Sequence, residues 1–275
     1  MGIFLAAGDG MVSATVIVFT LLTTVGLQIL SNLSNELGDF LSGLDRDGRN
    51  GPCYSLQVGG LTVREFRITI AITAAFCCVC GLLMIGFSYG WQVGWQTIVL
   101  LLLGASAIWA AMRYTLGKNP YGYRGLGDLF VFLFFGLVSV MGGYFVIRHT
   151  LTPWLLMPAS AIGLFSVAVL NVNNIRDMAS DKGIRRTLPL RIGERNAKIY
   201  QTILIAGGCL LVFGYLFCQP STPWRWLSLI TVPLYALHLA GVWKKSGKSL
   251  DPMLPLLVIT TFLLAITAGL PIALQ

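Results

Sequence analysis

Residues 153–174 read PWLLMPASAIGLFSVAVLNVNN, a stretch without a charged side chain. A helix needs about 20 mostly apolar residues to cross the hydrocarbon core of a bilayer. Only a helix or a closed barrel satisfies its own backbone polar groups in lipid, and a continuous apolar run lacks the alternation of a barrel strand. The stretch therefore predicts a transmembrane helix that ends in asparagines.

Seven further stretches of the chain share this apolar character. Of the 275 residues, 56% are hydrophobic and 11% are charged, whereas soluble domains have roughly 25% charged residues. We expect an all-α fold, a polytopic transmembrane helical bundle that forms a single domain over residues 1–275. A short apolar stub, Met1–Ala7, precedes eight spans. These spans lie near 11–33, 67–89, 95–112, 129–147, 153–174, 199–217, 224–242 and 254–272.

Basic residues are distributed unevenly among the loops. Of the 19 Lys and Arg residues, 17 lie in four alternate segments, and only Arg148 and Arg225 lie in the loops between them. Cytoplasmic loops carry an excess of Lys and Arg. We expect an integral protein of the bacterial cytoplasmic (inner) membrane, in contact with lipid and without a nucleic-acid partner. Its cytoplasmic segments are 34–67, 113–128, 175–198 and 243–253.

The first polar cluster ends the span near 11–33. It contains Asn32, Asn35, Glu36 and Asp39. Gly38 and Gly43 would let the chain turn so that Asp45 folds back toward these side chains. On a helix, residues four apart share a face, so Asn32 pairs with Glu36 and Asn35 with Asp39. The cluster would project amide and carboxylate oxygens from the end of a membrane helix.

A second cluster ends the span at 153–174 on the same expected side. It contains Asn171, Asn173, Asn174, Asp177 and Asp181. Again the spacings of three and four residues place oxygen ligands on one helical face. Ionisable residues at membrane depth are costly unless they face a polar cavity, so we treat both clusters as functional candidates.

Two facing carboxylate clusters suit a hard cation. Magnesium prefers carboxylate oxygens and usually completes its shell with water and substrate phosphate, while arginine binds phosphate through two N–H groups. The residues alone thus predict a diphosphate bound through Mg²⁺ at a membrane face, with its organic part in the bundle. The basic neighbours are Arg46 and Arg49 beside the first cluster, and Arg176, Lys182, Arg185 and Arg186 beside the second.

A third polar segment, 118–128, lies on the same expected side. Its glycines and Pro120 predict a shaped loop. Tyr123 and Arg124 could contact a phosphate or an aromatic acceptor. They fit an interfacial tyrosine and a topology-setting arginine equally well.

Together these motifs resemble the UbiA-type intramembrane prenyltransferases. Within that family the chain is most similar to the 1,4-dihydroxy-2-naphthoate prenyltransferases of menaquinone synthesis. The resemblance runs from about residue 11 to 272. It rests on Asn32-xx-Asn35-Glu36-xx-Asp39 with Gly51-Pro52, on Tyr-Arg-Gly-Leu-Gly-Asp at 123–128, and on Asn173-Asn174-Ile-Arg-Asp177-xxx-Asp181-Lys-Gly-xx-Arg186-Thr-Leu-Pro-Leu-Arg191-Ile-Gly193.

The resemblance implies nine helices around a cavity in which two aspartate-rich motifs hold Mg²⁺ and a polyprenyl diphosphate. Glu36 stands where the family usually has aspartate. The family's first helix is largely missing, as a misassigned start or a truncated chain would explain. Carried over by position, the implied metal ligands are Asn35, Glu36, Asp39, Asp45, Asn174, Asp177 and Asp181.

The implied activity is a Mg²⁺-dependent transfer of a polyprenyl group to 1,4-dihydroxy-2-naphthoate. Carbon dioxide and diphosphate leave, and demethylmenaquinone forms. The expected catalytic residues are Asp39, Asp45, Asp177 and Asp181, and the expected substrate-binding residues are Asn35, Asn174, Arg176, Lys182, Tyr123 and Arg124.

Two alternatives differ in substrate and in class. A related enzyme would use another aromatic acceptor, such as 4-hydroxybenzoate. A transporter would also place carboxylates in the membrane. Transporters, however, tend to bind at the midplane on broken helices, whereas here the clusters lie at helix ends on one side. Largely unbroken apolar runs favour the enzyme.

Overall fold

A computed structural model describes residues 1–43, 56, 60–219 and 223–274 of the protein. Over these residues the regular structure is helical, without a strand, which confirms the all-α prediction. Eight segments are long and apolar enough to cross a membrane, in agreement with the eight predicted spans. They are Ala14–Ser42, Val63–Tyr89, Trp95–Arg113, Gly127–Arg148, Pro153–Arg176, Glu194–Cys218, Trp226–Lys244 and Gly247–Ala273.

Contacts within the chain divide it into two compact units. The larger unit comprises Met1–Val12, Asp128–Ala179 and Leu188–Gln275, and the smaller unit comprises Ser13–Gly127 and Ser180–Thr187. A single domain over 1–275 stays a prediction. The second polar cluster is divided between the units, because Asp177 belongs to the larger one and Asp181 to the smaller one.

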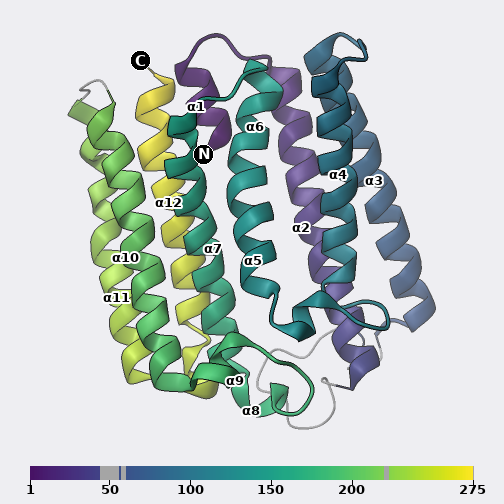
Figure 1. Ribbon diagram of the computed structural model, residues 1–275, viewed down its shortest axis with the longest axis vertical. Helices are drawn as coiled ribbons and strands as arrows, with labels where there is room; N and C mark the ends of the chain where they lie inside the picture. Colours follow the sequence, from purple (N-terminus) through teal and green to yellow (C-terminus); the bar gives the residue numbers. More distant parts are fainter. Residues whose placement is uncertain (44–55, 57–59, 220–222, 275) are drawn as a thin grey trace. The chain divides into compact units, whose positions relative to one another are not determined.

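Three long helices build the smaller unit. Helix α2 (Ala14–Ser42) packs against both α3 (Val63–Tyr89) and α4 (Trp95–Arg113), as Figure 1 shows. The core between them contains Leu30, Leu37, Phe66 and Ile70. Large apolar side chains on the outer faces, such as Ile72 and Val79, are exposed. Helices that are apolar on both their packed and their outer faces are typical of a lipid environment.

A capping box fixes the start of α3. The Thr62 side chain accepts a hydrogen bond from the Glu65 backbone N–H (3.2 Å), and the Glu65 carboxylate accepts one from the Thr62 N–H (2.8 Å). These bonds satisfy backbone donors that the first turn of a helix leaves unpaired. The helix therefore begins several residues before its apolar run.

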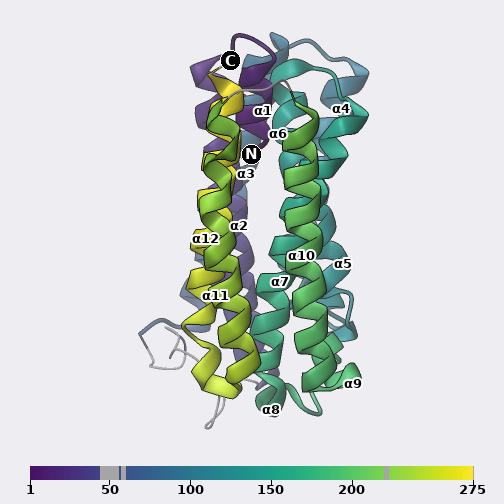
Figure 2. The same cartoon turned by 90° about the vertical axis from the view of Figure 1, so that its left-hand side faces the viewer.

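In the larger unit α7 (Leu156–Arg176) is the central helix. It packs against η2 (Phe132–Val138), α10 (Glu194–Cys218) and α12 (Met253–Ala273). More of its span is buried than of any other described span. The remaining helices include α1 (Gly2–Gly8), α5 (Gly127–Val131), α6 (Ser139–Arg148), α9 (Leu188–Ile192) and α11 (Thr231–Lys244), which lies beside α12 in Figure 2.

Two glycines allow α7 and η2 to approach closely. A Cβ added to Gly136 would lie 2.5 Å from the Gly163 Cα and 2.8 Å from the Ala159 carbonyl oxygen. A Cβ on Gly163 would lie 2.7 Å from the Phe132 ring. Membrane helices often associate through small residues, which let their backbones pack closely. Close packing matters there because the hydrophobic effect does not drive helices together in lipid. The contact brings η2 close to α7, the helix that carries Asn174 and ends just before Asp177.

Candidate active site

The described part of the first polar cluster, residues 32–39, lies near the C-terminal end of α2. Asp39 is buried (4% exposed) and shares a helical face with Asn35. The Thr115 hydroxyl donates to the Ser34 carbonyl oxygen (2.7 Å) and to the Asn35 amide oxygen (3.3 Å). Gly38 makes room for this contact, because an added Cβ would lie 2.5 Å from the Thr115 Cβ. The cluster is thereby tied to the segment that follows α4.

Tyr123 donates a hydrogen bond to Asp39. It lies in the 3₁₀ turn η1 (Tyr121–Arg124), and its hydroxyl is 2.8 Å from Asp39 Oδ1 and 3.0 Å from the Ser42 hydroxyl. Burial, together with the negative charge of Asp39, raises the pKa of Tyr123 to about 12. Tyr123 therefore keeps its proton at physiological pH and acts as a donor.

Arg185 lies between two carboxylates. Its Nη2 pairs with Asp39 Oδ1, and its Nε lies 3.9 Å from Asp181 Oδ1. The guanidinium also stacks over the Tyr123 ring at 4.8 Å from the centroid. Burial lowers the pKa of Arg185, but the charges of Asp39 and Asp181 outweigh it and hold the pKa above its ordinary value. Arg185 is thus a permanent cation with a 9% exposed side chain.

The loop that carries Arg185 is held to the same turn. The Arg186 backbone N–H donates to the Tyr123 carbonyl oxygen (3.0 Å), and the Arg185 N–H donates to the Asp181 carbonyl oxygen (3.0 Å). Residues of both sequence clusters, which are more than 140 positions apart, therefore meet in the smaller unit.

The donor set of the smaller unit fits part of a magnesium site. Asp39 and Asp181 already share one cation, and Asn35 adds an amide oxygen one turn away. These are oxygen ligands of the kind that magnesium prefers. Glu36 Oε1 instead accepts a bond from the Leu56 N–H (3.3 Å). Within the described ranges, no group of three or more His, Cys, Asp or Glu side chains gathers as a metal cluster.

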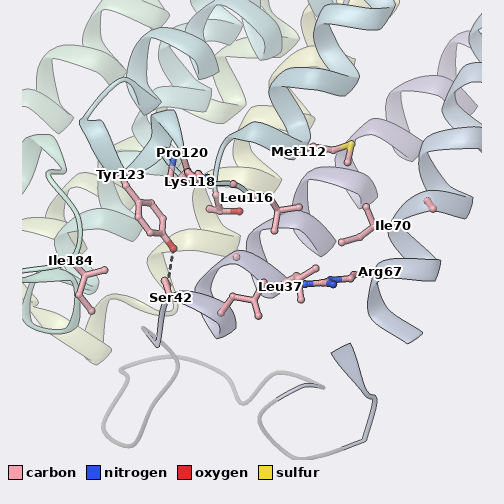
Figure 3. Close-up of a pocket in the computed structure, with 15 residues that line it drawn as sticks. Leu37, Ser42, Arg67, Ile70, Met112, Leu116, Lys118, Pro120, Tyr123 and Ile184 are labelled. Carbon is pink, nitrogen blue, oxygen red and sulfur yellow. Dashed lines mark hydrogen bonds between the residues drawn. The ribbon is translucent and has the colours of Figure 1, made fainter. Parts of the chain in front are cut away.

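A pocket of about 840 Å³ adjoins this cluster in the smaller unit (Figure 3). Apolar side chains from α2, α3 and the end of α4 form most of its wall, including Leu37, Ile70 and Met112. Two cationic residues, Arg67 and Lys118, line it, and no acidic residue is found among the described residues of its wall. Such a pocket can take a ligand with a negative head group and an apolar body.

In the larger unit Arg176 and Asp177 form a forked ion pair. Arg176 Nε and Nη2 each lie 2.7 Å from one carboxylate oxygen of Asp177, and both side chains are buried. Arg176 Nη1 also contacts Asp251 Oδ1 at 3.3 Å. Asn174, one turn before Asp177, is 4% exposed. The second cluster thus keeps a carboxylate and an amide at the end of α7.

The structure brings three of the predicted site residues, Asp39, Tyr123 and Asp181, into one cluster. Arg124 and Lys182 belong to the same unit and are exposed. Asn174, Arg176 and Asp177 belong to the larger unit, and Asp45 lies outside the described residues. Their roles as ligands stay predictions.

Sequence reasoning left Arg185 out of the expected site residues, although it named Arg185 as a basic neighbour. Its spacing carried a usable signal, because Arg185 follows Asp181 by four positions, where opposite charges attract on a helical turn. Ser42 and the pocket cations Arg67 and Lys118 carried no comparable local signal.

Apolar helices that gather carboxylates and cations beside an apolar pocket define an integral-membrane protein with a site for an anionic ligand that has an apolar body. The chain is a member of the UbiA prenyltransferase family, whose pattern matches residues 1–254.

Relatives of known name match most of the chain. It is 40% identical over 258 residues to the 1,4-dihydroxy-2-naphthoate octaprenyltransferase of Escherichia coli (strain K12), which covers 92% of this chain and 82% of that protein. The protein of the same name from Haemophilus influenzae (strain ATCC 51907 / DSM 11121 / KW20 / Rd) is 34% identical over 257 residues, covering 93% and 83%.

The fold is similar to a solved one. The apo structure of a UbiA homolog from Aeropyrum pernix K1 superposes with a TM-score of 0.76 and covers 99% of this chain and 94% of that chain. Since the sequences are 16% identical, this likeness bears on the fold alone, and it confirms the UbiA-like bundle.

Proposed function

We propose that the protein transfers a polyprenyl group from a polyprenyl diphosphate to 1,4-dihydroxy-2-naphthoate, releasing carbon dioxide and diphosphate to give demethylmenaquinol, the reduced form of demethylmenaquinone. The observation that carries the proposal is the convergence of Asp39 and Asp181, from two distant motifs, on one cation. Relatives named for this acceptor support it over nearly the whole chain. Their name further suggests an octaprenyl donor.

In this proposal a bound Mg²⁺ would supply positive charge that stabilises the diphosphate leaving group. Asp39, Asp45, Asp177 and Asp181 are its proposed carboxylate ligands. Asn35 and Asn174 orient ligands or water, and Glu36 supplies a further carboxylate. Carboxylates and amides at the ends of α2 and α7 support these roles, since they are the oxygen ligands that magnesium takes in phosphate sites.

The basic side chains hold the diphosphate. Arg124, Arg176 and Lys182 are its proposed contacts, and the cations of the pocket, Arg67 and Lys118, add positive charge beside the first motif. Charge that develops on the leaving oxygen during C–O cleavage is stabilised by such preorganised cations. Tyr123, held protonated beside Asp39, donates a hydrogen bond and keeps that carboxylate in place.

Ionisation of the allylic C–O bond leaves a carbocation, and the electron-rich naphthoate ring attacks it at the carboxylate-bearing carbon. Loss of carbon dioxide from the carboxylate then returns the electron pair of the broken C–C bond to the ring, which restores its aromaticity and gives the quinol. The apolar walls of the bundle exclude water, which would otherwise capture the cation. The pocket is lined by two cationic residues and mostly by apolar side chains. This combination supports binding of the diphosphate beside the cations and of the prenyl chain among the apolar side chains.

The orientation of the site is also part of the proposal. Basic residues on alternate loops favour a cytoplasmic position for the ends of α2 and α7. The host membrane would be the bacterial cytoplasmic (inner) membrane, from which the protein takes its polyprenyl donor.

The test is an assay of the detergent-solubilised protein with 1,4-dihydroxy-2-naphthoate, octaprenyl diphosphate and Mg²⁺. We expect demethylmenaquinol from the wild type, detected as demethylmenaquinone after oxidation in air. We expect a loss of at least about 100-fold in Asp177→Ala or after chelation, as for removal of a preorganised charge. Glu65→Gln, an exposed carboxylate at the start of α3, serves as the matched control and should keep its activity.

Product with 4-hydroxybenzoate but none with the naphthoate would contradict the naphthoate as acceptor. The proposal of an aromatic prenyltransferase would remain. Absence of product with either acceptor would contradict prenyl transfer to these rings. Undiminished activity in excess chelator would contradict the proposed dependence on a divalent metal.

A further inference from the structure

Arg185 neutralises the two carboxylates that the proposed function assigns to a metal. Its guanidinium lies between Asp39 and Asp181, and the three side chains are at most 9% exposed. A buried carboxylate is costly unless an opposite charge or hydrogen bonds stabilise it. Removal of one partner from a buried ion pair is costly for the same reason. A cation that took the place of Arg185 would therefore have to compensate both carboxylates.

We propose that Arg185 is an exchangeable counter-ion, which releases Asp39 and Asp181 when a divalent metal and a diphosphate bind together, and then contacts a phosphate oxygen. The inference deepens the proposed function and rests on it. In this proposal Arg185 pairs with the two carboxylates before metal and substrate bind, and it binds the substrate once the metal has taken its place.

The chemistry of the groups favours this exchange. A divalent metal takes carboxylate oxygens and substrate phosphate oxygens into one shell. A guanidinium binds carboxylate and phosphate equally well, through the same fork of N–H groups. Metal and Arg185 compete for the same carboxylate oxygens, whereas diphosphate offers Arg185 a new partner. After the exchange every charge remains paired.

The geometry provides a short path for this exchange. Arg185 stacks over the ring of Tyr123, and that ring lines the pocket that also contains Lys118. The preceding residue, Ile184, lines the same pocket, and Figure 3 draws it beside Tyr123. A change of side-chain rotamer, with the backbone still bonded to Tyr123 through Arg186, would bring the guanidinium to the pocket edge.

Exchange makes metal and diphosphate binding interdependent. The metal alone must displace Arg185 without offering it a partner, so its affinity is reduced. The metal–diphosphate complex offers both partners, so it binds without that loss. Such a coupling is reciprocal between the two ligands. The device would prevent the carboxylates from holding a metal that has no substrate.

The test measures binding, not turnover, in the intact solubilised protein. Mn²⁺ is the metal probe, followed by its electron paramagnetic resonance signal, and inorganic pyrophosphate with Mn²⁺ is the second probe. In Arg185→Gln we expect Mn²⁺ alone to bind about tenfold more tightly and the Mn²⁺–pyrophosphate complex about tenfold more weakly, within the usual range of coupling between sites. Arg186→Gln removes the same charge from the adjacent, exposed residue and should not produce these opposite changes.

A merely structural Arg185 would weaken both measurements together, and that result would overturn the proposal. Unchanged affinity for Mn²⁺ alone would also overturn it. If Arg185→Gln does not fold, the same two affinities are measured in Arg185→Lys, and they decide between the exchange and a structural role. A lysine keeps the charge but has no Nε to face Asp181, so the same opposite changes are expected at smaller size. Failure of the exchange is distinct from failure of the proposed function, which is judged by the naphthoate assay of the wild type.

Discussion

Tyr123 connects the polar cluster of the smaller unit to its pocket. It hydrogen-bonds Asp39 and Ser42 through its hydroxyl, while its ring lies under Arg185 and lines the pocket wall. A hydrogen bond to a charged group contributes about 1.5–3 kcal/mol. Because Tyr123 is only partly buried, the lower end of that range applies.

Tyr123→Phe is expected to lower the free energy of unfolding by about 1.5 kcal/mol and the activity by roughly tenfold. The pKa of Tyr123 is raised from 10.0 to about 12 in the folded protein, so its contribution is fully present below pH 10. It is lost as the pH rises from 10 toward 12. Melting temperatures of both proteins, measured from pH 7 to pH 11, check this.

Tyr121→Phe is the matched control, since the Tyr121 hydroxyl donates to the Ala110 carbonyl oxygen (2.7 Å) and not to a carboxylate. It should lower stability without the loss of activity. A stability difference for Tyr123→Phe that already narrows between pH 7 and pH 9 would contradict the assignment.

At the scale of elements, a buried polar chain joins α7 to its neighbours in the larger unit. The Asn171 amide donates to Gln201 Oε1 (2.8 Å), and Gln201 Nε2 lies 3.0 Å from His238 Nε2. His238 Nδ1 lies 3.0 Å from the Met253 carbonyl oxygen. A carbonyl only accepts and an amide nitrogen only donates, so the ring is neutral with its proton on Nδ1. Each hydrogen bond in this polar chain therefore runs in the same donor-to-acceptor direction, from α7 through α10 and α11 to α12.

Gln201→Leu would break this chain at its centre and leave Asn171 and His238 without their shared partner. Interhelical hydrogen bonds in membranes contribute about 0.6–2 kcal/mol each, so we expect a loss of about 1–2 kcal/mol. Thermal unfolding in detergent measures it. Gln28→Leu is the matched control, because it removes an exposed hydrogen bond between Gln28 and Asn32 on α2. Equal melting temperatures for Gln201→Leu and the wild type would contradict a stabilising chain.

For the whole molecule, the distribution of charge predicts which helix ends face the cytoplasm. Thr150 follows α6, and Lys248 lies between α11 and α12; both are exposed and belong to the larger unit. In a cysteine-free background, we expect a membrane-impermeant maleimide to label Thr150→Cys in intact cells. Lys248→Cys should be labelled only after the cells are opened. The reverse pattern would contradict the proposed orientation.

Local physics explains how much of the fold the sequence predicted. In lipid, each span must satisfy its own backbone polar groups, so apolar length alone marked the eight helices. Their ends were harder to predict: α2 continues through Asp39 to Ser42, and α3 starts at a capping box, because polar groups stabilise those turns.

The sequence by itself determined an all-α membrane protein and the two groups of oxygen ligands at the ends of two spans. Only the tertiary structure decided which charges meet. Asp39 pairs with Arg185 and Tyr123, whereas Arg176 is taken by its neighbour Asp177. Helical spacing reaches four residues, but Asp39 and Arg185 are 146 positions apart. Contacts at that range depend on how loops and helices pack, and local spacing does not carry that information.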